Sequence, residues 1–132
     1  MKRIILVSIF SVLFINLFGQ TQLEMNTNAK TEFEKADNAL NQIYLKLLKG
    51  YKNDSAFIRS LKESQLQWVK YRDAQVKMKY PSSRDTYGSV LPMCQGNYLE
   101  ELTINRIKEL KPWIDGVEEG DACSGSIKLK GQ

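Results

Sequence analysis

The 132-residue sequence contains no histidine and only two cysteines. Histidine is the commonest general base and the commonest metal ligand, and two cysteines without histidine make a poor zinc site. The sequence also has no glycine-rich phosphate-binding loop. These absences argue against a catalytic site, and we expect no enzymatic activity, no metal and no cofactor.

The sequence has no hydrophobic run long enough to span a bilayer comfortably. Its start places Lys2 and Arg3 before an apolar run over residues 4–18, which is typical of a secretory signal. We predict a signal peptide over residues 1–19 and a mature domain over residues 20–132. Because no cysteine follows the apolar run, no bacterial lipid anchor is expected. The sequence therefore predicts a periplasmic or secreted protein without a stable membrane anchor.

The numbers of basic and acidic residues are similar. Without residues 1–19 the 19 basic residues fall to 17 against 15 acidic ones, and the net charge falls from +4 to +2. The lysines are spread along the chain, as on an ordinary solvated surface, so we expect no nucleic-acid partner. A composition of 42% hydrophobic and 26% charged residues favours one globular domain over disorder.

The two cysteines, Cys94 and Cys123, are an even pair in a chain that we expect to be exported. In an oxidising compartment such a pair is more often a disulfide than two free thiols. We therefore predict a bridge between them that pins the C-terminal tail, with the two Cα atoms within about 7 Å of each other.

Apolar residues recur every three to four positions in two segments separated by a short turn, the spacing of amphipathic helices. The first segment begins near residues 27–31 and ends around Gly50. The second begins at a cap, Asp54 or Ser55, whose side chain accepts a hydrogen bond from a free amide, and it ends at Pro81. A short link between two long amphipathic helices favours an antiparallel hairpin.

A third helix of the same periodicity is expected over residues 99–110, after a loop at 81–92 that has proline at both ends. Pro112 ends this helix. Residues 112–132 are rich in glycine and serine, with at most a short strand at 127–130. The sequence thus predicts an all-α fold: an antiparallel helical hairpin plus a third helix, with an irregular, disulfide-pinned C-terminal tail.

Polar side chains fall on the apolar stripes of all three predicted helices. Leu61, Gln65, Trp68, Arg72 and Val76 are spaced by four, three, four and four residues, so Gln65 and Arg72 face inward with their apolar neighbours. The other inward polar residues are Asp37, Asn41 and Tyr44 in the first helix and Arg106 in the third.

These six residues, which we call the polar seam, admit two interpretations. A buried arginine left unpaired would cost several kcal/mol, and Asp37 is the best-placed partner for Arg72. The absence of histidine and metal ligands favours a structural seam, which is our prediction. The alternative is an active site, because polar groups on an apolar stripe are sometimes functional.

The two tryptophans, Trp68 and Trp113, are candidates for stacking on sugar rings. Packing in the hydrophobic core is the favoured interpretation for both.

Short motifs occur in order along the chain: EMN at 24–26, ADNALNQIY at 36–44, QLQWVKYRD at 65–73, GS at 88–89 and LTINRIKEL at 102–110. Over about residues 21–111 the chain resembles the bacterial family named after the lysozyme inhibitor LprI. The resemblance implies an exported, mostly helical domain without known enzymatic activity, and lysozyme inhibition, which is attributed to its namesake. It also implies cysteines where this chain has Asn28, Val76 and Tyr98, so the family's bridge cannot be carried over to this chain's two cysteines.

The leading hypothesis is an exported, non-enzymatic protein-binding domain of the cell envelope that inhibits lysozyme. The alternative is a general periplasmic interaction or scaffold module with another protein or a glycan partner. Lysozymes are commonly basic with an acidic catalytic cleft, so we expect Arg84 in the loop at 81–93 to reach the cleft carboxylates. Asp115, Glu118 and Glu119 would steer the approach as an acidic flank. A solvated loop is the alternative for this acidic stretch.

Overall fold

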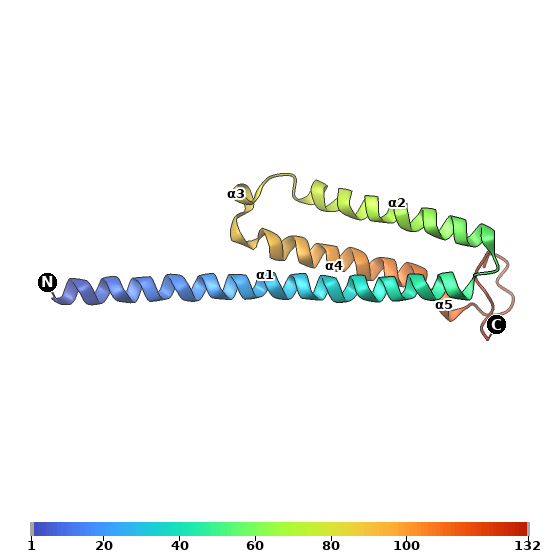
Figure 1. Ribbon diagram of the computed structural model, residues 1–132, viewed down its shortest axis with the longest axis horizontal. Helices are drawn as coiled ribbons and strands as arrows, with labels where there is room; N and C mark the ends of the chain where they lie inside the picture. The colour runs from blue at the N-terminus through green and yellow to red at the C-terminus, as the bar shows by residue number, and fades with distance from the viewer. Residues whose placement is uncertain (1, 132) are drawn as a thin grey trace.

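Three long helices, α1, α2 and α4, lie side by side in this protein (Figure 1). The computed structural model describes the backbone of residues 2–131 and the side chains of residues 21–131. In Figure 1, α4 runs parallel to α1, and α2 runs antiparallel to both. The elements are α1 (Lys2–Gly50), α2 (Ser55–Lys79), α3 (Arg84–Tyr87), η1 (Gly88–Val90), α4 (Leu91–Leu110) and α5 (Pro112–Asp115). The predicted all-α class with three long helices is confirmed.

The first helix begins earlier than the sequence indicated. α1 runs unbroken from Lys2 to Gly50, because no proline occurs in this stretch and Gly19, the one glycine in its interior, costs only about 1 kcal/mol in a helix. Among the described residues, no helix has the length and apolar character needed to cross a membrane. The side chains of residues 1–19 lie outside the described part, and their cleavage as a signal peptide stays a prediction.

The second helix begins as predicted. The Asp54 side chain caps α2, and its Oδ1 accepts a hydrogen bond of 2.9 Å from the Phe57 backbone amide. α2 ends at Lys79, because a residue before proline, here Tyr80, is disfavoured in the helical conformation.

The predicted loop at 81–92 is wrong in part, since it contains α3, η1 and the start of α4. Pro92 lies in the first turn of α4, where the missing amide hydrogen would have no helical partner anyway. Proline therefore opens this helix rather than closing the loop.

α1 packs most extensively against α4, not against α2. Small or short side chains face each other in this parallel pair: Ala29 and Ala36 of α1, and Gly96 and Thr103 of α4, are all buried. Both pairs are spaced by seven residues, the repeat of helices that pack along one seam. A Cβ atom at Gly96 would lie 3.1 Å from the Ala29 backbone carbon, so any side chain there would push the two helices apart by a few tenths of an ångström.

The largest apolar cluster lies toward the turn between α1 and α2. Its buried residues are Leu40, Leu47, Tyr51, Leu61, Trp68 and Leu110. Because all three long helices contribute to it, this cluster holds the bundle together at one end.

The predicted disulfide is wrong: Cys94 and Cys123 are free thiols. Cys94 lies in the first turn of α4 near α3, whereas the tail packs at the far end of α4, where Lys128 Nζ donates to the Gly50 carbonyl at 2.9 Å. The helical residues after Cys94 span about 24 Å at 1.5 Å per residue, far beyond the reach of a disulfide. Hydrogen bonds, not a bridge, pin the tail.

The tail contains no strand within the described residues, and the predicted strand at 127–130 is reduced to one isolated bridge between Val117 and Leu129. The Val117 amide donates to the Lys128 carbonyl, and the Lys130 amide donates to the Val117 carbonyl, both at 3.0 Å. These bonds fold the tail back on itself beside α5.

Candidate functional site

Arg72 joins α2 to α1. Its Nη1 lies 3.4 Å from Asp37 Oδ1, and its Nη2 lies 3.1 Å from Asp73 Oδ1. Asn41 Nδ2 donates a 3.3 Å hydrogen bond to the other Asp37 oxygen. The Arg72 side chain is 15% exposed and that of Asp37 is 38% exposed. The pair therefore lies at the solvent edge of the helix interface.

Arg106 joins α4 to α2 more deeply, with a side chain that is 10% exposed. Its Nε donates to Gln65 Oε1 at 3.2 Å, its Nη2 to Ser64 Oγ at 2.8 Å and its Nη1 to Glu109 Oε2 at 3.0 Å. Ser64 and Glu109 were not predicted from the sequence. The spacing of three residues between Arg106 and Glu109, which places them on one helix face, was the available signal for the second.

Trp68 connects the two arginine sites. The guanidinium carbons of Arg72 and Arg106 lie 5.3 Å and 5.9 Å from its ring centroid, within the range of cation–π attraction. Trp68 is buried, so its ring is occupied by core packing and is not available for sugar stacking. Tyr44, the remaining member of the polar seam, packs against the apolar cluster.

The buried polar atoms of the polar seam are satisfied by contacts within the bundle. Among the side chains of residues 21–131, no buried nitrogen or oxygen lacks a hydrogen-bond partner. In the same part of the chain, no group of three or more acidic, cysteine or histidine side chains is arranged to hold a metal ion. Such an arrangement can hold three helices in register, and we propose that this is its role.

Replacing Arg72 by alanine is expected to lower the free energy of unfolding by about 2 kcal/mol. Breaking a fully buried pair from one side costs roughly 3 to 5 kcal/mol, but Asp37 remains partly solvated, which reduces the cost. Urea denaturation followed by circular dichroism measures the change. Lys70→Ala, an exposed position on the same helix, is the matched control. Equal stability of the two variants would contradict a structural role for Arg72.

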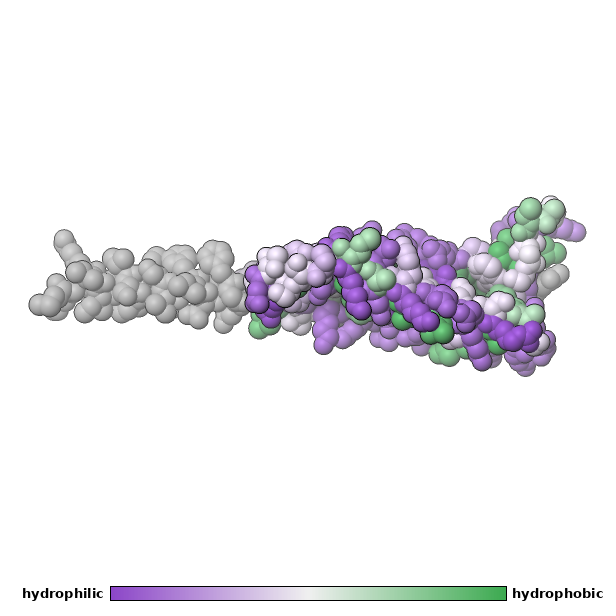
Figure 2. All heavy atoms as spheres, turned by 90° about the horizontal axis from the view of Figure 1, so that it is seen from above, coloured by the Kyte–Doolittle hydropathy of each residue, from purple (hydrophilic) through white to green (hydrophobic). Residues whose placement is uncertain are grey.

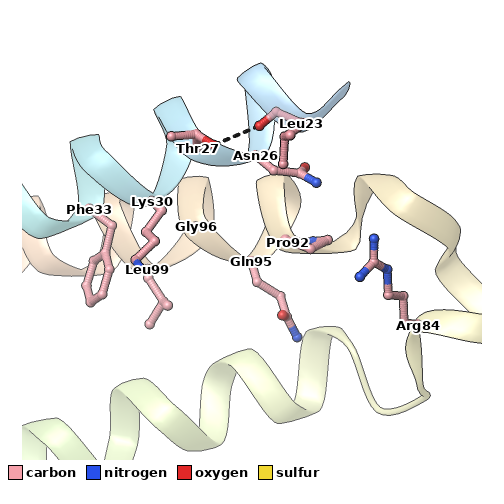
Figure 3. Close-up of a pocket in the computed structure, with 10 residues that line it drawn as sticks. All are labelled: Leu23, Asn26, Thr27, Lys30, Phe33, Arg84, Pro92, Gln95, Gly96 and Leu99. Atoms are coloured by element: carbon pink, nitrogen blue, oxygen red, sulfur yellow. Dashed lines mark hydrogen bonds between the residues drawn. The ribbon is translucent and has the colours of Figure 1, made fainter. Parts of the chain in front are cut away.

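An open cleft of about 560 Å³ lies at the α3 end of the bundle (Figure 3). Leu23 and Phe33 of α1 and Pro92 and Leu99 of α4 give it apolar walls, and Arg84 extends toward it from α3. The remaining lining residues are Asn26, Thr27, Lys30, Gln95 and Gly96. The cleft therefore combines apolar surface with positive charge.

Arg84 is exposed and lies in the first turn of the short helix α3. Within the described residues its guanidinium forms no ion pair or hydrogen bond. The position of this segment is held from two sides. Asn26 Nδ2 donates to the Ser89 carbonyl at 3.0 Å, and the rings of Tyr80 and Tyr87 meet edge to face at 5.8 Å. Arg84 is thus a free cation on a supported segment.

Tyr80 connects this segment to α4. Its hydroxyl donates to the Cys94 carbonyl at 3.4 Å. Burial raises the pKa of Tyr80 above its ordinary value, and the neighbouring Cys94, Tyr98 and Tyr87 raise it further. The raised pKa favours the protonated hydroxyl, which is the form that donates this bond.

The predicted acidic flank does not lie beside Arg84. Asp115 ends α5, at the opposite end of α4 from α3 (Figure 1). Lys111 lies 3.6 Å from Asp115, and Lys130 forms an ion pair with Glu118, so part of the acidic charge is neutralised within the tail. The idea of one surface formed by Arg84, Asp115, Glu118 and Glu119 is therefore wrong, because α4 separates its two halves by about 30 Å.

The surface between these ends is mainly hydrophilic. On the face shown in Figure 2, hydrophobic residues form small separate patches among hydrophilic ones. The exposed large hydrophobic residues near the cleft include Leu23, Met25 and Val90.

Comparison with known proteins gives one family. The family model described as "Lysozyme inhibitor LprI" matches residues 18–110. An uncharacterized protein of Rhizobium meliloti (strain 1021) is 29% identical over 109 residues, covering 74% of this chain and 77% of that protein. No solved structure matches the chain. The family match includes the polar seam and the cleft with Arg84, and it ends before α5 and the tail.

Proposed function

The chain belongs to the lysozyme inhibitor LprI family, and from this membership we propose that it is an exported, non-enzymatic protein-binding domain that inhibits lysozyme. We place the binding site at the surface, because the buried polar atoms of the polar seam are satisfied within the bundle. Arg84, whose guanidinium has no ion pair among the described residues, is exposed at the α3 end.

The observation that carries the binding surface is Arg84, an exposed cation beside an apolar-walled cleft. Lysozyme cleaves its substrate with a pair of carboxylates. A guanidinium can bind a carboxylate through two parallel hydrogen bonds. In our proposal, α3 enters the catalytic cleft of the lysozyme and Arg84 binds one of these carboxylates, while Leu23 and Val90 contact the rim.

The contacts behind α3 favour this mode of binding. Asn26 and the tyrosine pair hold the segment in place before any partner arrives. A segment that is already ordered loses less conformational entropy on binding.

Long-range electrostatic attraction contributes little to this binding, because the net charge of +2 without the predicted signal peptide does not favour approach to a basic enzyme.

Replacing Arg84 by alanine is expected to raise the concentration needed for half-maximal lysozyme inhibition at least tenfold. A hydrogen bond to a charged group contributes about 1.5 to 3 kcal/mol, and about 1.4 kcal/mol corresponds to a factor of ten. The measurement is a cell-wall lysis assay with several lysozyme classes, using protein purified after export from the full-length sequence. Arg59→Ala is the matched control, because Arg59 is exposed in the first turns of α2 at the other end of the bundle.

Three further results of this assay are decisive. Neutralising Glu118 and Glu119 together is expected to leave inhibition unchanged, because the tail lies away from α3. Inhibition that survives Arg84→Ala would keep the function and discard this surface. Absence of inhibition by the unaltered protein at large molar excess would favour the periplasmic scaffold role, and a pull-down from periplasmic extract would then search for the partner.

A further inference from the structure

A second cavity, which we call the tail pocket, lies at the opposite end of the bundle from the Arg84 cleft. It has a volume of about 270 Å³, is open to solvent on one side, and is lined by residues of α2, α4, α5 and the tail. Leu61 and Leu110 are buried at its floor. Phe57 and Trp113 are half-buried and form aromatic walls, with ring centroids 6.5 Å apart. The pocket therefore offers two aromatic side chains beside an apolar floor.

The rim of the tail pocket is polar. Ser60, Ser64 and Ser126 place three hydroxyl groups there, and the ion pair of Arg106 with Glu109 adds further donors and acceptors. Because the positive and negative charges are paired, the rim has no net charge to attract an ion. It can instead exchange hydrogen bonds with a neutral, hydroxyl-rich ligand.

Tail contacts build the outer wall of this pocket. Trp113 Nε1 donates a 2.9 Å hydrogen bond to Ser126 Oγ, and the Lys128 amide donates to the Tyr51 hydroxyl at 3.3 Å. Gly116 allows the tail to fold back, because it has a φ of 75° and a Cβ there would lie 3.0 Å from the Lys130 amide nitrogen. The wall is thus held by several independent contacts.

This pocket does not follow from family membership. The family match ends at residue 110, whereas Trp113 and Ser126 come after it. The pocket also lies about the length of α4 from Arg84, so its use is independent of the proposed lysozyme contact.

We propose that the tail pocket binds one pyranose ring of a neutral glycan. A pyranose has an apolar face of C–H groups and a rim of hydroxyls, which match the aromatic walls and the serine-rich rim. Small-molecule sites combine apolar and aromatic lining with a few convergent polar groups, at volumes of roughly 300 to 1,000 Å³. A cavity of about 270 Å³ accommodates a single ring, with the rest of the glycan extending past the exposed rim.

The test uses the two tryptophans of the chain as reporters in the nitrogen–proton NMR spectrum. Protein exported from the full-length sequence is titrated with chitotriose and, separately, maltotriose. We expect the Trp113 indole signal to shift saturably with a dissociation constant of about 1 mM. The indole signal of buried Trp68 is the internal control and should stay in place.

Two variants assign the site. Ser60→Phe fills the exposed rim while leaving Trp113 as reporter, and it should weaken binding at least tenfold. Trp113→Ala, followed through the Ser126 amide, should weaken binding equally. Arg84→Ala should keep the sugar affinity within twofold, which separates this site from the lysozyme surface. Loss of lysozyme inhibition in any variant does not bear on this result.

The proposal is overturned if neither sugar shifts the Trp113 signal at about 10 mM, ten times the expected dissociation constant. It is equally overturned if Ser60→Phe, with an unchanged circular dichroism spectrum, binds as the parent does. Shifts confined to residues of the Arg84 cleft would place sugar binding elsewhere and also refute it.

Discussion

Arg106→Ala is expected to lower the free energy of unfolding by about 3 kcal/mol. The side chain is 10% exposed and makes three hydrogen bonds, to Gln65, Ser64 and Glu109. Hydrogen bonds to charged groups contribute more than neutral ones, and removing one member of a buried network leaves the others without partners. Alanine also removes the guanidinium that packs on Trp68.

Urea denaturation followed by circular dichroism measures this change, with Lys108→Ala as the control on the same helix. Lys108 is exposed, and surface substitutions usually change stability by less than about 0.5 kcal/mol. The order of effects should be Arg106 above Arg72, because Arg72 and Asp37 are more exposed. A loss below about 1 kcal/mol for Arg106→Ala would mean that the polar seam adds little to the fold.

Gly96→Leu is expected to destabilise the protein by about 3 kcal/mol. A Cβ at this position would already lie 3.1 Å from the Ala29 backbone carbon and Cβ, and the remaining carbons of leucine would force α1 and α4 apart. Overpacking of a close contact typically costs about 1 to 3 kcal/mol and occasionally more. Because Gly96 also lines the Arg84 cleft, lysozyme inhibition should fall as well.

Gly50→Ala is the matched control for this substitution. Nothing lies within 4 Å of a Cβ at Gly50, and alanine is a better helix former than glycine by about 1 kcal/mol. Thermal and urea unfolding should therefore show unchanged or slightly higher stability. If Gly96→Leu behaved like Gly50→Ala, the close approach of α1 and α4 would not be the contact that organises the bundle.

Much of the helical structure could be predicted because it depends on residues a few positions apart. The three-to-four-residue spacing of apolar side chains located the long helices, and Asp54 showed where α2 begins. The same spacing placed Arg72 and Arg106 on inward faces, and the structure brings Arg72 to Asp37, the partner chosen from the sequence. The start of α1 was placed too late. The helix continues through the stretch before residue 27 because that stretch contains no helix-breaking proline.

The candidate binding site was harder to predict. Arg84 was selected as a cation in a loop, and its helical turn and the cleft beside it depend on contacts from α1 and α4. The acidic residues were assigned to the same surface as Arg84 because acidic charge would steer the approach to a basic lysozyme. The two segments lie before and after the third helix in the sequence. They flank opposite ends of that helix, and loop composition alone carries no information about distance in space.

The sequence by itself determined the helical class, the inward-facing polar residues and the absence of histidine chemistry, because composition and helical periodicity are local properties. Only the tertiary structure decided that α1 pairs with α4, through the close approach at Gly96 and Ala29. It also decided that Cys94 and Cys123 remain apart and that Trp113 and Ser126 close a pocket. These outcomes depend on how the chain folds back over the length of α4, and that arrangement is set by packing between residues distant in sequence.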